Sequence, residues 1–217
     1  MTVHWWARER LDYQDGELHL GRQNLANLVK SAGTPTFVYD ATRIAQNLDR
    51  IHTALDKHAV EHEIFFALKA NRYLPLVTFL KLNGRCGLDV CSPNELRLGR
   101  QVGFREEQIV YTNTSVSKED VEWLAKHPRV HVNVDSLSSL RRLATRCPGR
   151  PIGLRVNPQV GVAYHDHLAY SGDKVTKFGI YADRFGEALD IAKALGAPIN
   201  TLHFHMGSGY MTPDLAT

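Results

Sequence analysis

The sequence predicts an α/β fold in which parallel strands alternate with helices, and two observations support this. Short apolar runs rich in β-forming residues recur along the chain, and their centres at Phe66, Leu88, Val110, Val132 and Leu154 are each 22 residues apart. Segments with helix start signals lie between the runs. A helix that connects one strand to the next places the two strands parallel in one sheet.

The apolar runs are each predicted to be a buried strand. They cover residues 36–39, 64–68, 87–90, 109–112, 130–134, 152–156 and 202–206. The first run precedes the regular series, which leaves six strands for the repeating unit.

The helices are predicted between these strands, over residues 41–58, 94–102, 121–126, 136–145 and 183–195. Asp40 precedes the first helix and Ser92-Pro93 opens the second. Ser117, followed three residues later by Asp120, opens the third. An oxygen-bearing side chain before a helix satisfies its free N–H groups, and proline suits the first helical position.

Two parallel architectures compete, the closed (β/α)8 barrel and the open doubly wound sheet. An open dinucleotide-binding sheet would require a Gly-x-Gly-x-x-Gly turn after its first strand. The only near match in the sequence, Gly207-Ser208-Gly209, lies far from that strand. The barrel is therefore favoured. Because a whole barrel takes about 250 residues, we expect one truncated after about six strands. The segment from Asn157 to Ile180 breaks the repeat and is predicted to be a long loop at the active-site end of the barrel.

Composition excludes several classes of protein. With 43% hydrophobic and 23% charged residues, the chain is not disordered. The formal net charge is only +3 and basic residues are interspersed with acids, so we expect no nucleic-acid partner. No run is long enough to span a membrane, and the amino terminus lacks the order of a signal peptide. Three cysteines without metal-type spacing indicate a reducing, cytoplasmic setting.

The strongest chemical signal is Lys69, which ends the apolar run Ile64-Phe65-Phe66-Ala67-Leu68. Strand alternation would place Phe65, Ala67 and Lys69 on one face, with the lysine stem drawn into the interior. A strand-end lysine can also simply reach solvent. The functional interpretation is an amine with a pKa lowered by burial, suited to forming a Schiff base with an aldehyde or ketone.

A second signal is the segment 202–209, in which His203 and His205 share one strand face. Together with His165-Asp166-His167 this permits a metal-hydrolase hypothesis, although neither pair has an acidic ligand at a diagnostic spacing. The following Gly207-Ser208-Gly209 is either an ordinary turn or a cradle of backbone amides for a phosphate.

Further charged residues end other predicted strands. Asp89 ends the second strand of the regular series and Arg155 the fifth. Asp135 follows the fourth and precedes Ser136, and we interpret it as a helix cap. Since the carboxyl ends of barrel strands meet at one mouth, lysine, aspartate, arginine and histidine there indicate a site.

Six motifs, in order, resemble the fold-type III pyridoxal-phosphate decarboxylases of basic amino acids. They are Thr34-Pro35-Thr36-Phe37-Val38-Tyr39-Asp40, FALKAN at 66–71, GLDVCSPNEL at 87–96, LRVNP at 154–158, KFGI at 177–180 and HFHMGSGY at 203–210. LRVNP, the long loop and the His-x-Gly-Ser-Gly strand are more similar to the diaminopimelate branch than to the ornithine branch.

The resemblance implies roles for individual residues. Lys69 would hold pyridoxal 5'-phosphate as an imine and help to protonate the product, and Asp89 would be the acid near the imine side of the ring. Arg155 would lie beneath the cofactor and the imidazole of His205 would stack on the ring. Gly207 and Ser208 would bind the phosphate, and no metal is implied.

The expected function is pyridoxal-phosphate-dependent decarboxylation of a diamino acid, with meso-diaminopimelate converted to L-lysine as the leading reaction. Alternatives are decarboxylation of D-ornithine, D-lysine or an antibiotic or siderophore intermediate, and an inactive binding or regulatory relative. The family's glycine-rich phosphate loop and substrate-pocket residues would lie beyond position 217, so the chain by itself is expected to be incomplete. Residues 1–33 are predicted to belong to a β-rich domain and residues 34–217 to the partial barrel, with a homodimer in the full-length form.

Overall fold

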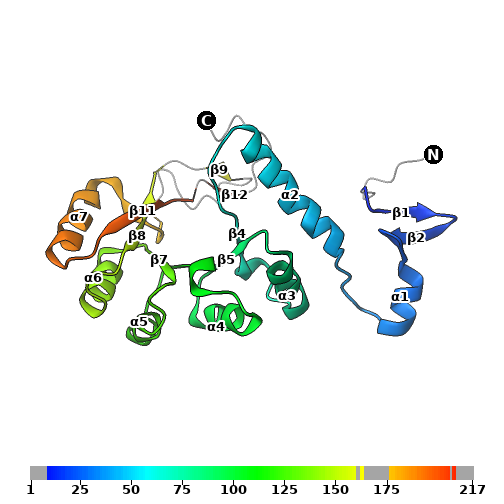
Figure 1. The fold of residues 1–217 in the computed structure, drawn as a ribbon, viewed down its shortest axis with the longest axis horizontal. Coiled ribbons are helices and arrows are strands. Elements are labelled where there is room, and N and C mark those ends of the chain that lie inside the picture. Colours follow the sequence, from blue (N-terminus) through cyan, green and yellow to red (C-terminus); the bar gives the residue numbers. More distant parts are fainter. Residues whose placement is uncertain (1–8, 160–161, 164–175, 206, 209–217) are drawn as a thin grey trace. The chain divides into compact units, whose positions relative to one another are not determined.

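The computed structural model describes residues 9–159, 162–163, 176–205 and 207–208. The chain divides into two compact units (Figure 1). The first comprises Met1–His62 with Thr78–Arg85, and the second comprises Glu63–Val77 with Cys86–Thr217. The second unit holds the repeating strands and helices.

The first unit contains a small antiparallel sheet, whose individual strands were not predicted although residues 1–33 were assigned to a β-rich domain. Strands β1 (Leu11–Gln14), β2 (Glu17–Leu20) and β3 (Gln23–Asn24) pair in that order. Asp15 and Gly16 both have positive φ, which gives the tight turn between β1 and β2 the twist that a hairpin requires. Helix α1 (Leu25–Ala32) follows directly.

The prediction of a strand at 36–39 is wrong. These residues pair with no strand among the described residues, and Phe37 is 89% exposed. Their β-propensity is high, but a strand also needs a ladder partner and a face to cover. The segment leads instead to Asp40, whose carboxylate accepts a hydrogen bond from the N–H of Thr42 and starts helix α2 (Ala41–Lys57).

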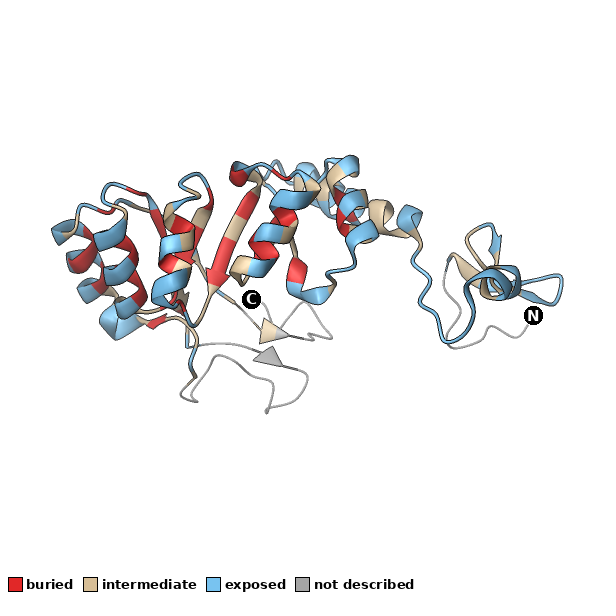
Figure 2. Ribbon diagram, turned by 90° about the horizontal axis from the view of Figure 1, so that it is seen from below, coloured by how far each residue is buried: buried red, intermediate tan, exposed pale blue. Residues whose placement is uncertain are grey.

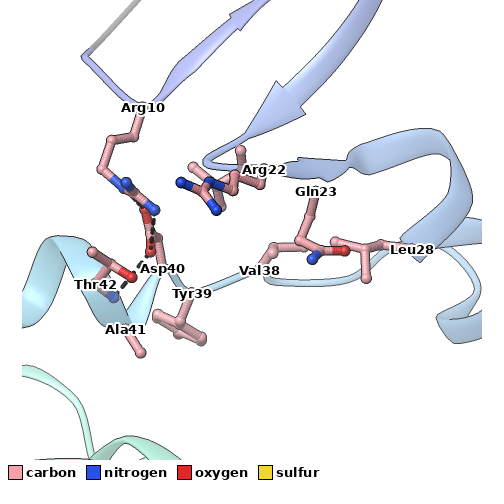
Figure 3. A pocket seen from close by; sticks show the side chains of 10 residues that line it. Arg10, Arg22, Gln23, Leu28, Val38, Tyr39, Asp40, Ala41 and Thr42 are labelled. Atoms are coloured by element: carbon pink, nitrogen blue, oxygen red, sulfur yellow. Dashed lines mark hydrogen bonds and ion pairs between the residues drawn. The ribbon is translucent and has the colours of Figure 1, made fainter.

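Asp40 also lines a pocket of about 700 Å³ within the first unit, where it pairs with Arg10 (Figure 3). Arg10 holds the pKa of this carboxyl below its usual value through their hydrogen bond. One acid thus starts a helix and joins it to the segment that precedes β1.

The second unit confirms the alternation of parallel strands and helices. In chain order it runs β4 (Phe65–Ala67), α3 (Leu74–Asn83), β5 (Gly87–Val90), α4 (Pro93–Val102), β6 (Ile109–Asn113), α5 (Lys118–Ala125), β7 (His131–Val134), α6 (Leu137–Arg146), β8 (Ile152–Asn157), α7 (Phe185–Ala194) and β11 (Ile199–His203). Helix α3 is divided between the units, since Thr78–Arg85 belong to the first. The strands pair in sequence order from β4 to β8, and β11 pairs with β8. All these pairs are parallel.

Short elements complete this unit. The single turns η1 (Leu68–Ala70), η2 (Glu106–Gln108) and η4 (Ala182–Arg184) precede longer elements. Strand β10 (Ile180–Tyr181) extends the sheet beside the end of β8. Strands β9 (Val162–Ala163) and β12 (Gly207–Ser208) form a separate parallel pair.

The helix boundaries agree with the start signals in the sequence. Ser92 and Ser117 cap α4 and α5, and Asp120 completes the capping box of α5. Helix α3 was not predicted, because the run Leu74-Pro75-Leu76-Val77 continues apolar without the spacing of an amphipathic helix.

The core lies between the sheet and helices α4 to α7, which lie side by side on one face of the strands (Figures 1 and 2). The strands send alternate apolar side chains into it, and these are at most 1% exposed: Leu88, Val90, Ile109, Tyr111, Val132, Val134, Ile152 and Leu154. Helix α4 approaches closely at Gly99, where a methyl group would meet the Leu88 side chain at 2.8 Å. The side chains at the intervening strand positions point to the opposite face of the strands.

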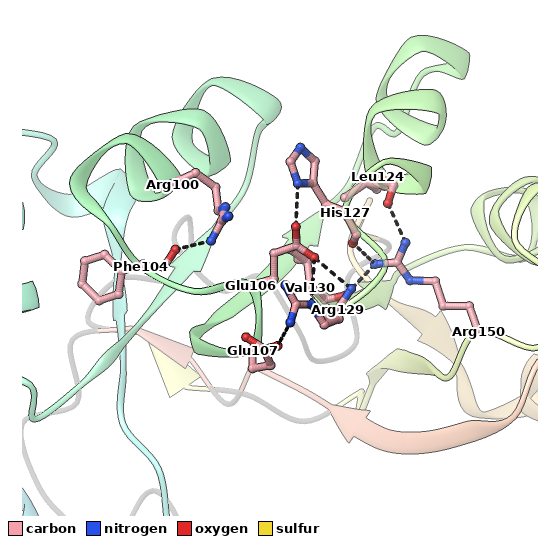
Figure 4. A network of polar contacts seen from close by, with 9 residues as sticks. All are labelled: Arg100, Phe104, Glu106, Glu107, Leu124, His127, Arg129, Val130 and Arg150. Carbon is pink, nitrogen blue, oxygen red and sulfur yellow. Dashed lines mark hydrogen bonds and ion pairs between the residues drawn. The ribbon is translucent and has the colours of Figure 1, made fainter.

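A buried polar network holds the loops at the amino ends of the strands (Figure 4). Glu106 accepts hydrogen bonds from Nδ1 of His127 at 3.0 Å and from the N–H of Arg129 at 3.1 Å. Arg150 is only 7% exposed, and it donates to the carbonyl oxygens of Leu124, His127 and Val130. These contacts fix the C-terminal end of α5 against the start of β8.

Candidate active site

The strand face opposite the helices is polar, which is unusual for a barrel-type core. Strand β7 and the residue after it read His131-Val132-Asn133-Val134-Asp135, so the valines face the helices and the polar residues face the other way. We call this the polar face. It comprises Asp89, Thr112, His131, Asn133, Asp135, Gly153, Arg155, His203 and His205. Barrel interiors usually hold branched apolar residues, so this composition marks a site.

Hydrogen bonds order the middle of the polar face. Nε2 of His131 lies 3.1 Å from Oδ1 of Asn133, and Nδ2 of Asn133 donates to Oγ1 of Thr112 at 3.0 Å. Gly153 makes room for these side chains, because a methyl group there would overlap Oδ1 of Asn133. The hydrogen bonds thus join β7 to β6, and Thr112 in turn lowers the pKa of Asp89 on the neighbouring strand β5.

Lys69 lies at the edge of this face, but not as predicted. Strand β4 ends at Ala67 and η1 begins at Leu68, so strand alternation stops before it reaches the lysine. Leu68 turns into the core with 0% exposure, while Lys69 is exposed. The stem is therefore not drawn into the interior in the described structure, where β4 pairs only with β5.

Asp89 is the acid whose pKa depends on the charge of Lys69. It lies on β5 beside Ala67 of β4, two residues before the lysine. Burial raises the pKa of its carboxyl, while the positive charge of Lys69 acts in the opposite direction. A carboxylate that is partly desolvated and faced by an amine suits proton exchange.

Arg155 lies on β8 next to His203 of β11 in the strand register. Burial lowers the pKa of its guanidinium, and the carboxylates of Asp135 and Asp89 oppose this effect. Its Cζ lies 4.8 Å from the ring centre of Phe178, a cation–π distance. Arg155 is thus a partly buried cation whose charge is stabilised by two acids.

The interpretation of Asp135 as a helix cap is wrong. The side chain of Ser136 caps α6 by accepting a hydrogen bond from the N–H of Ser139. Asp135 is only 3% exposed, and its Oδ1 has no hydrogen-bond partner in the described structure. Burial raises the pKa of this carboxyl, and Arg155 is the largest opposing influence. Asp135 therefore belongs to the polar face.

The two histidines of the last strand segment complete the site. Burial lowers the pKa of His203 to about 4, and the positive charge of Arg155 adds to this effect. The pKa of His205 is lowered by burial and then by Arg155 and Lys69. Both imidazoles are therefore neutral near pH 7. Nδ1 of His203 is buried and has no hydrogen-bond partner in the described structure.

The segment after His205 is described only in part. Gly207 and Ser208 form β12, which pairs with Val162 and Ala163 of the long loop. Gly209 and the motif His165-Asp166-His167 lie outside the described residues. Within the described ranges, no group of three or more His, Cys, Asp or Glu side chains could hold a metal ion. In the same ranges, no helix is long and apolar enough to cross a membrane.

Several residues of the polar face were missed from the sequence. His131, Asn133 and Thr112 were not singled out, and Asp135 was assigned another role. The signal was present, because a strand of a parallel sheet is normally apolar throughout, whereas β7 alternates valine with polar residues.

Asn157, at the end of β8, ties the end of the long loop to the sheet. Its Nδ2 donates to the carbonyl of Phe178 at 3.0 Å and to Oγ1 of Thr176 at 3.2 Å. These bonds hold Phe178 near the strand that carries Arg155, the cation that lies over its ring.

The chain is similar to known proteins over most of its length. Residues 42–215 match the sequence model of the family described as "Pyridoxal-dependent decarboxylase, pyridoxal binding domain". The chain is 34% identical over 200 residues to diaminopimelate decarboxylase of Methanothermobacter thermautotrophicus, covering 92% of this chain and 46% of that protein. It is 30% identical over 199 residues to the enzyme of Archaeoglobus fulgidus, covering 89% and 46%. The chain thus spans about half the length of the curated relatives it matches.

A solved structure has the same fold. The crystal structure of diaminopimelate decarboxylase from M. jannaschii in complex with L-lysine superposes with a TM-score of 0.79 at 23% identity, over 93% of this chain and 49% of that one. The six parallel strands and their helices match its barrel domain, which confirms the predicted fold class.

The residues of the polar face fit a pyridoxal group. Lys69 offers an exposed primary amine for an aldehyde. Two buried polar atoms without partners, Oδ1 of Asp135 and Nδ1 of His203, lie on the same face. The neutral imidazole of His205 provides a flat surface near both Lys69 and Arg155. With residues 42–215 matched, this chain belongs to the pyridoxal-dependent decarboxylase family and carries its pyridoxal-binding domain.

Proposed function

We propose that the protein containing this chain decarboxylates meso-diaminopimelate to L-lysine with pyridoxal 5'-phosphate as cofactor. The single observation that carries the proposal is the gathering of Asp89, Arg155 and His205 on one polar face with Lys69 at its edge. The curated relatives quoted above support the substrate, since they are named diaminopimelate decarboxylases. The L-lysine in the M. jannaschii structure corresponds to the proposed product.

Lys69 is the residue proposed to hold the cofactor covalently. Its amine sits on a short turn at the end of β4, where it can reach an aldehyde without a strand's side-chain alternation restricting it. When bound, pyridoxal phosphate supplies an electron sink for the pair released as carbon dioxide leaves. The proton that replaces carbon dioxide is proposed to come from the Lys69 ammonium.

Asp89 and Arg155 are proposed to set the charge around that amine. The charge of Lys69 lowers the pKa of Asp89, so this carboxylate can in turn stabilise the ammonium form. Arg155, whose charge is stabilised by Asp135 and Asp89, would add positive charge beneath a bound ring. An arginine there favours negative charge that develops on a bound ring during reaction.

His205 is proposed to support the ring from one side. Burial and two nearby cations lower the pKa of His205, so a neutral imidazole can stack without repelling a protonated ring. Gly207 and Ser208 are proposed to bind the phosphate, and their backbone is held by the pairing of β12 with β9.

The remaining assignments concern the whole protein. We propose that the whole protein is a homodimer in the cytoplasm. Three free cysteines, Cys86, Cys91 and Cys147, support the cytoplasmic location. Residues 1–33 are proposed to form part of a β-rich domain, to which β1, β2 and β3 would contribute. Another basic amino acid as substrate, or an inactive relative, remains the alternative.

The test of this function has two parts. Carbon dioxide release from meso-diaminopimelate, D-ornithine and D-lysine should be greatest for the first. Incubation with pyridoxal phosphate followed by borohydride should attach a phosphopyridoxyl group to Lys69, as located by peptide mass spectrometry, and Lys69→Ala should abolish it. Attachment that persists at an unchanged level in Lys69→Ala would refute the proposal.

A further inference from the structure

A buried carboxylate ties the turn that carries Lys69 to the strand that carries Asp89. Glu95 is 2% exposed, and its Oε1 accepts a hydrogen bond from Nε of Arg72 at 2.6 Å. Its Oε2 accepts a hydrogen bond from the N–H of Cys91 at 2.8 Å. Arg72 follows η1 by two residues, and Cys91 follows Asp89 by two. Glu95 therefore joins the two chain segments on which the proposed amine and its acid stand.

Local sequence fixes the carboxylate in this place. Ser92 caps α4 and accepts a hydrogen bond from the N–H of Glu95 at 3.2 Å, with Pro93 at the first helical position. Glu95 is thus the third residue of the helix, where the free N–H groups and the helix dipole favour a negative charge. Its position does not depend on Arg72.

A carboxylate this deeply buried requires a positive partner, and Arg72 supplies it. Glu95 is the cause of the raised pKa of Arg72. Lys69 is the other cation of the segment 63–77 and stands three residues before Arg72, on the turn η1. The charges of both residues lower the pKa of the Cys91 thiol, while burial and Glu95 raise it. Without Arg72, the Lys69 ammonium is the cation that this segment could offer to Glu95.

We propose that Arg72 is a positioning residue for Lys69. By neutralising Glu95, Arg72 keeps the lysine amine from being held as an ion pair and leaves it free to react with the cofactor aldehyde. This inference rests on the proposed function of Lys69. It adds to it a residue that touches neither cofactor nor substrate.

The test measures how fast the amine reacts in the purified full chain. Nζ of Lys69 attacks the aldehyde carbon of pyridoxal phosphate, water leaves as the C=N bond forms, and borohydride delivers hydride to give a stable secondary amine. We expect Arg72→Met to slow labelling of Lys69 at pH 7.5 by about tenfold, since a new ion pair between Lys69 and Glu95 would stabilise the unreactive ammonium. Arg72→Lys, which keeps the positive charge, should restore most of the rate.

A second substitution separates charge from structure. In the double variant Arg72→Met/Glu95→Gln the buried charge is gone, while the amide oxygen can still accept from the N–H of Cys91. Labelling should return to within about twofold of the original rate. The matched control is Arg146→Met, since Arg146 is also a half-exposed arginine paired with a glutamate, Glu122, at 2.7 Å. This control should leave labelling unchanged.

The outcomes are distinct. Normal labelling in Arg72→Met would overturn this inference while leaving the role of Lys69 intact. Slow labelling that Glu95→Gln does not relieve would also overturn it, because the bridge would then act only through structure. Labelling that survives Lys69→Ala would instead refute the proposed function itself.

Discussion

Replacing Arg150 by methionine should destabilise the second unit more than any exposed arginine substitution. The guanidinium is buried and donates three hydrogen bonds to carbonyl oxygens, to Leu124 at 2.7 Å, to His127 at 3.1 Å and to Val130 at 2.5 Å (Figure 4). The Leu124 carbonyl lies in the last turn of α5 and the other two follow that helix, so a positive charge there also complements the helix dipole.

The expected loss in the free energy of unfolding depends on which hydrogen bonds the three carbonyl oxygens keep without Arg150. A hydrogen bond to a charged donor contributes about 1.5–3 kcal/mol, so three would give about 5–9 kcal/mol. Two effects reduce this loss. The carbonyls of Leu124 and His127 keep backbone donors, from His127 and Val130. Burial of the Arg150 charge also has a desolvation cost, which lowers the pKa of the guanidinium, and methionine would not carry this cost. The expected net loss is about 2–4 kcal/mol.

Urea unfolding followed by circular dichroism measures the change, with the slope checked for constancy. A loss of about 3 kcal/mol corresponds to a melting temperature lower by about 6–12 °C for a chain of this size. Arg142→Met is the control, because Arg142 also donates to a backbone carbonyl, that of Ser138 at 3.3 Å, but is exposed. If the two variants lost equal stability, or if Arg150→Met cost under about 1 kcal/mol, this account of the buried guanidinium would be wrong.

Two further predictions concern the polar face. Gly153→Ala should lower the free energy of unfolding by about 1–3 kcal/mol, because the methyl group would overlap Oδ1 of Asn133. The control is Gly186→Ala on α7, which should be neutral or stabilising because an added methyl group would meet no atom within 4 Å. Equal effects of the two substitutions in urea unfolding would contradict this prediction. His203 has a pKa of about 4, below the value of about 6.5 in an unfolded chain, so the unfolded state takes up the proton first. Stability should therefore decline as pH falls from about 6.5 toward 4, and should not change through this group above that range. His203→Gln should flatten the profile, and an unaltered slope would show that His203 does not cause it.

Sequence alone determined the repeating strands, the helix starts and the family. The 22-residue spacing identified five strands, because consecutive parallel strands of one sheet here have crossovers of similar length, and an apolar run after the long loop identified the sixth. Ser92, Ser117 and Asp120 identified helix starts because capping depends only on neighbours in the chain. The ordered motifs placed Lys69, Asp89, Arg155 and His205 at strand ends, and the parallel register brings those ends to one edge.

Tertiary structure decided which of these residues are buried and what they contact. The sequence left two placements open for Lys69, drawn into the interior or reaching solvent. It is exposed, because β4 ends two residues earlier and has one strand partner among the described residues. Asp135 was expected as a cap but is buried, because the adjacent Ser136 takes that role and Arg155 stands on the next strand. The pairing of Arg72 with Glu95 spans 23 residues and has no local signature. Burial and charge pairing depend on residues distant in sequence, so a local pattern can place a side chain on a strand but cannot identify its neighbours.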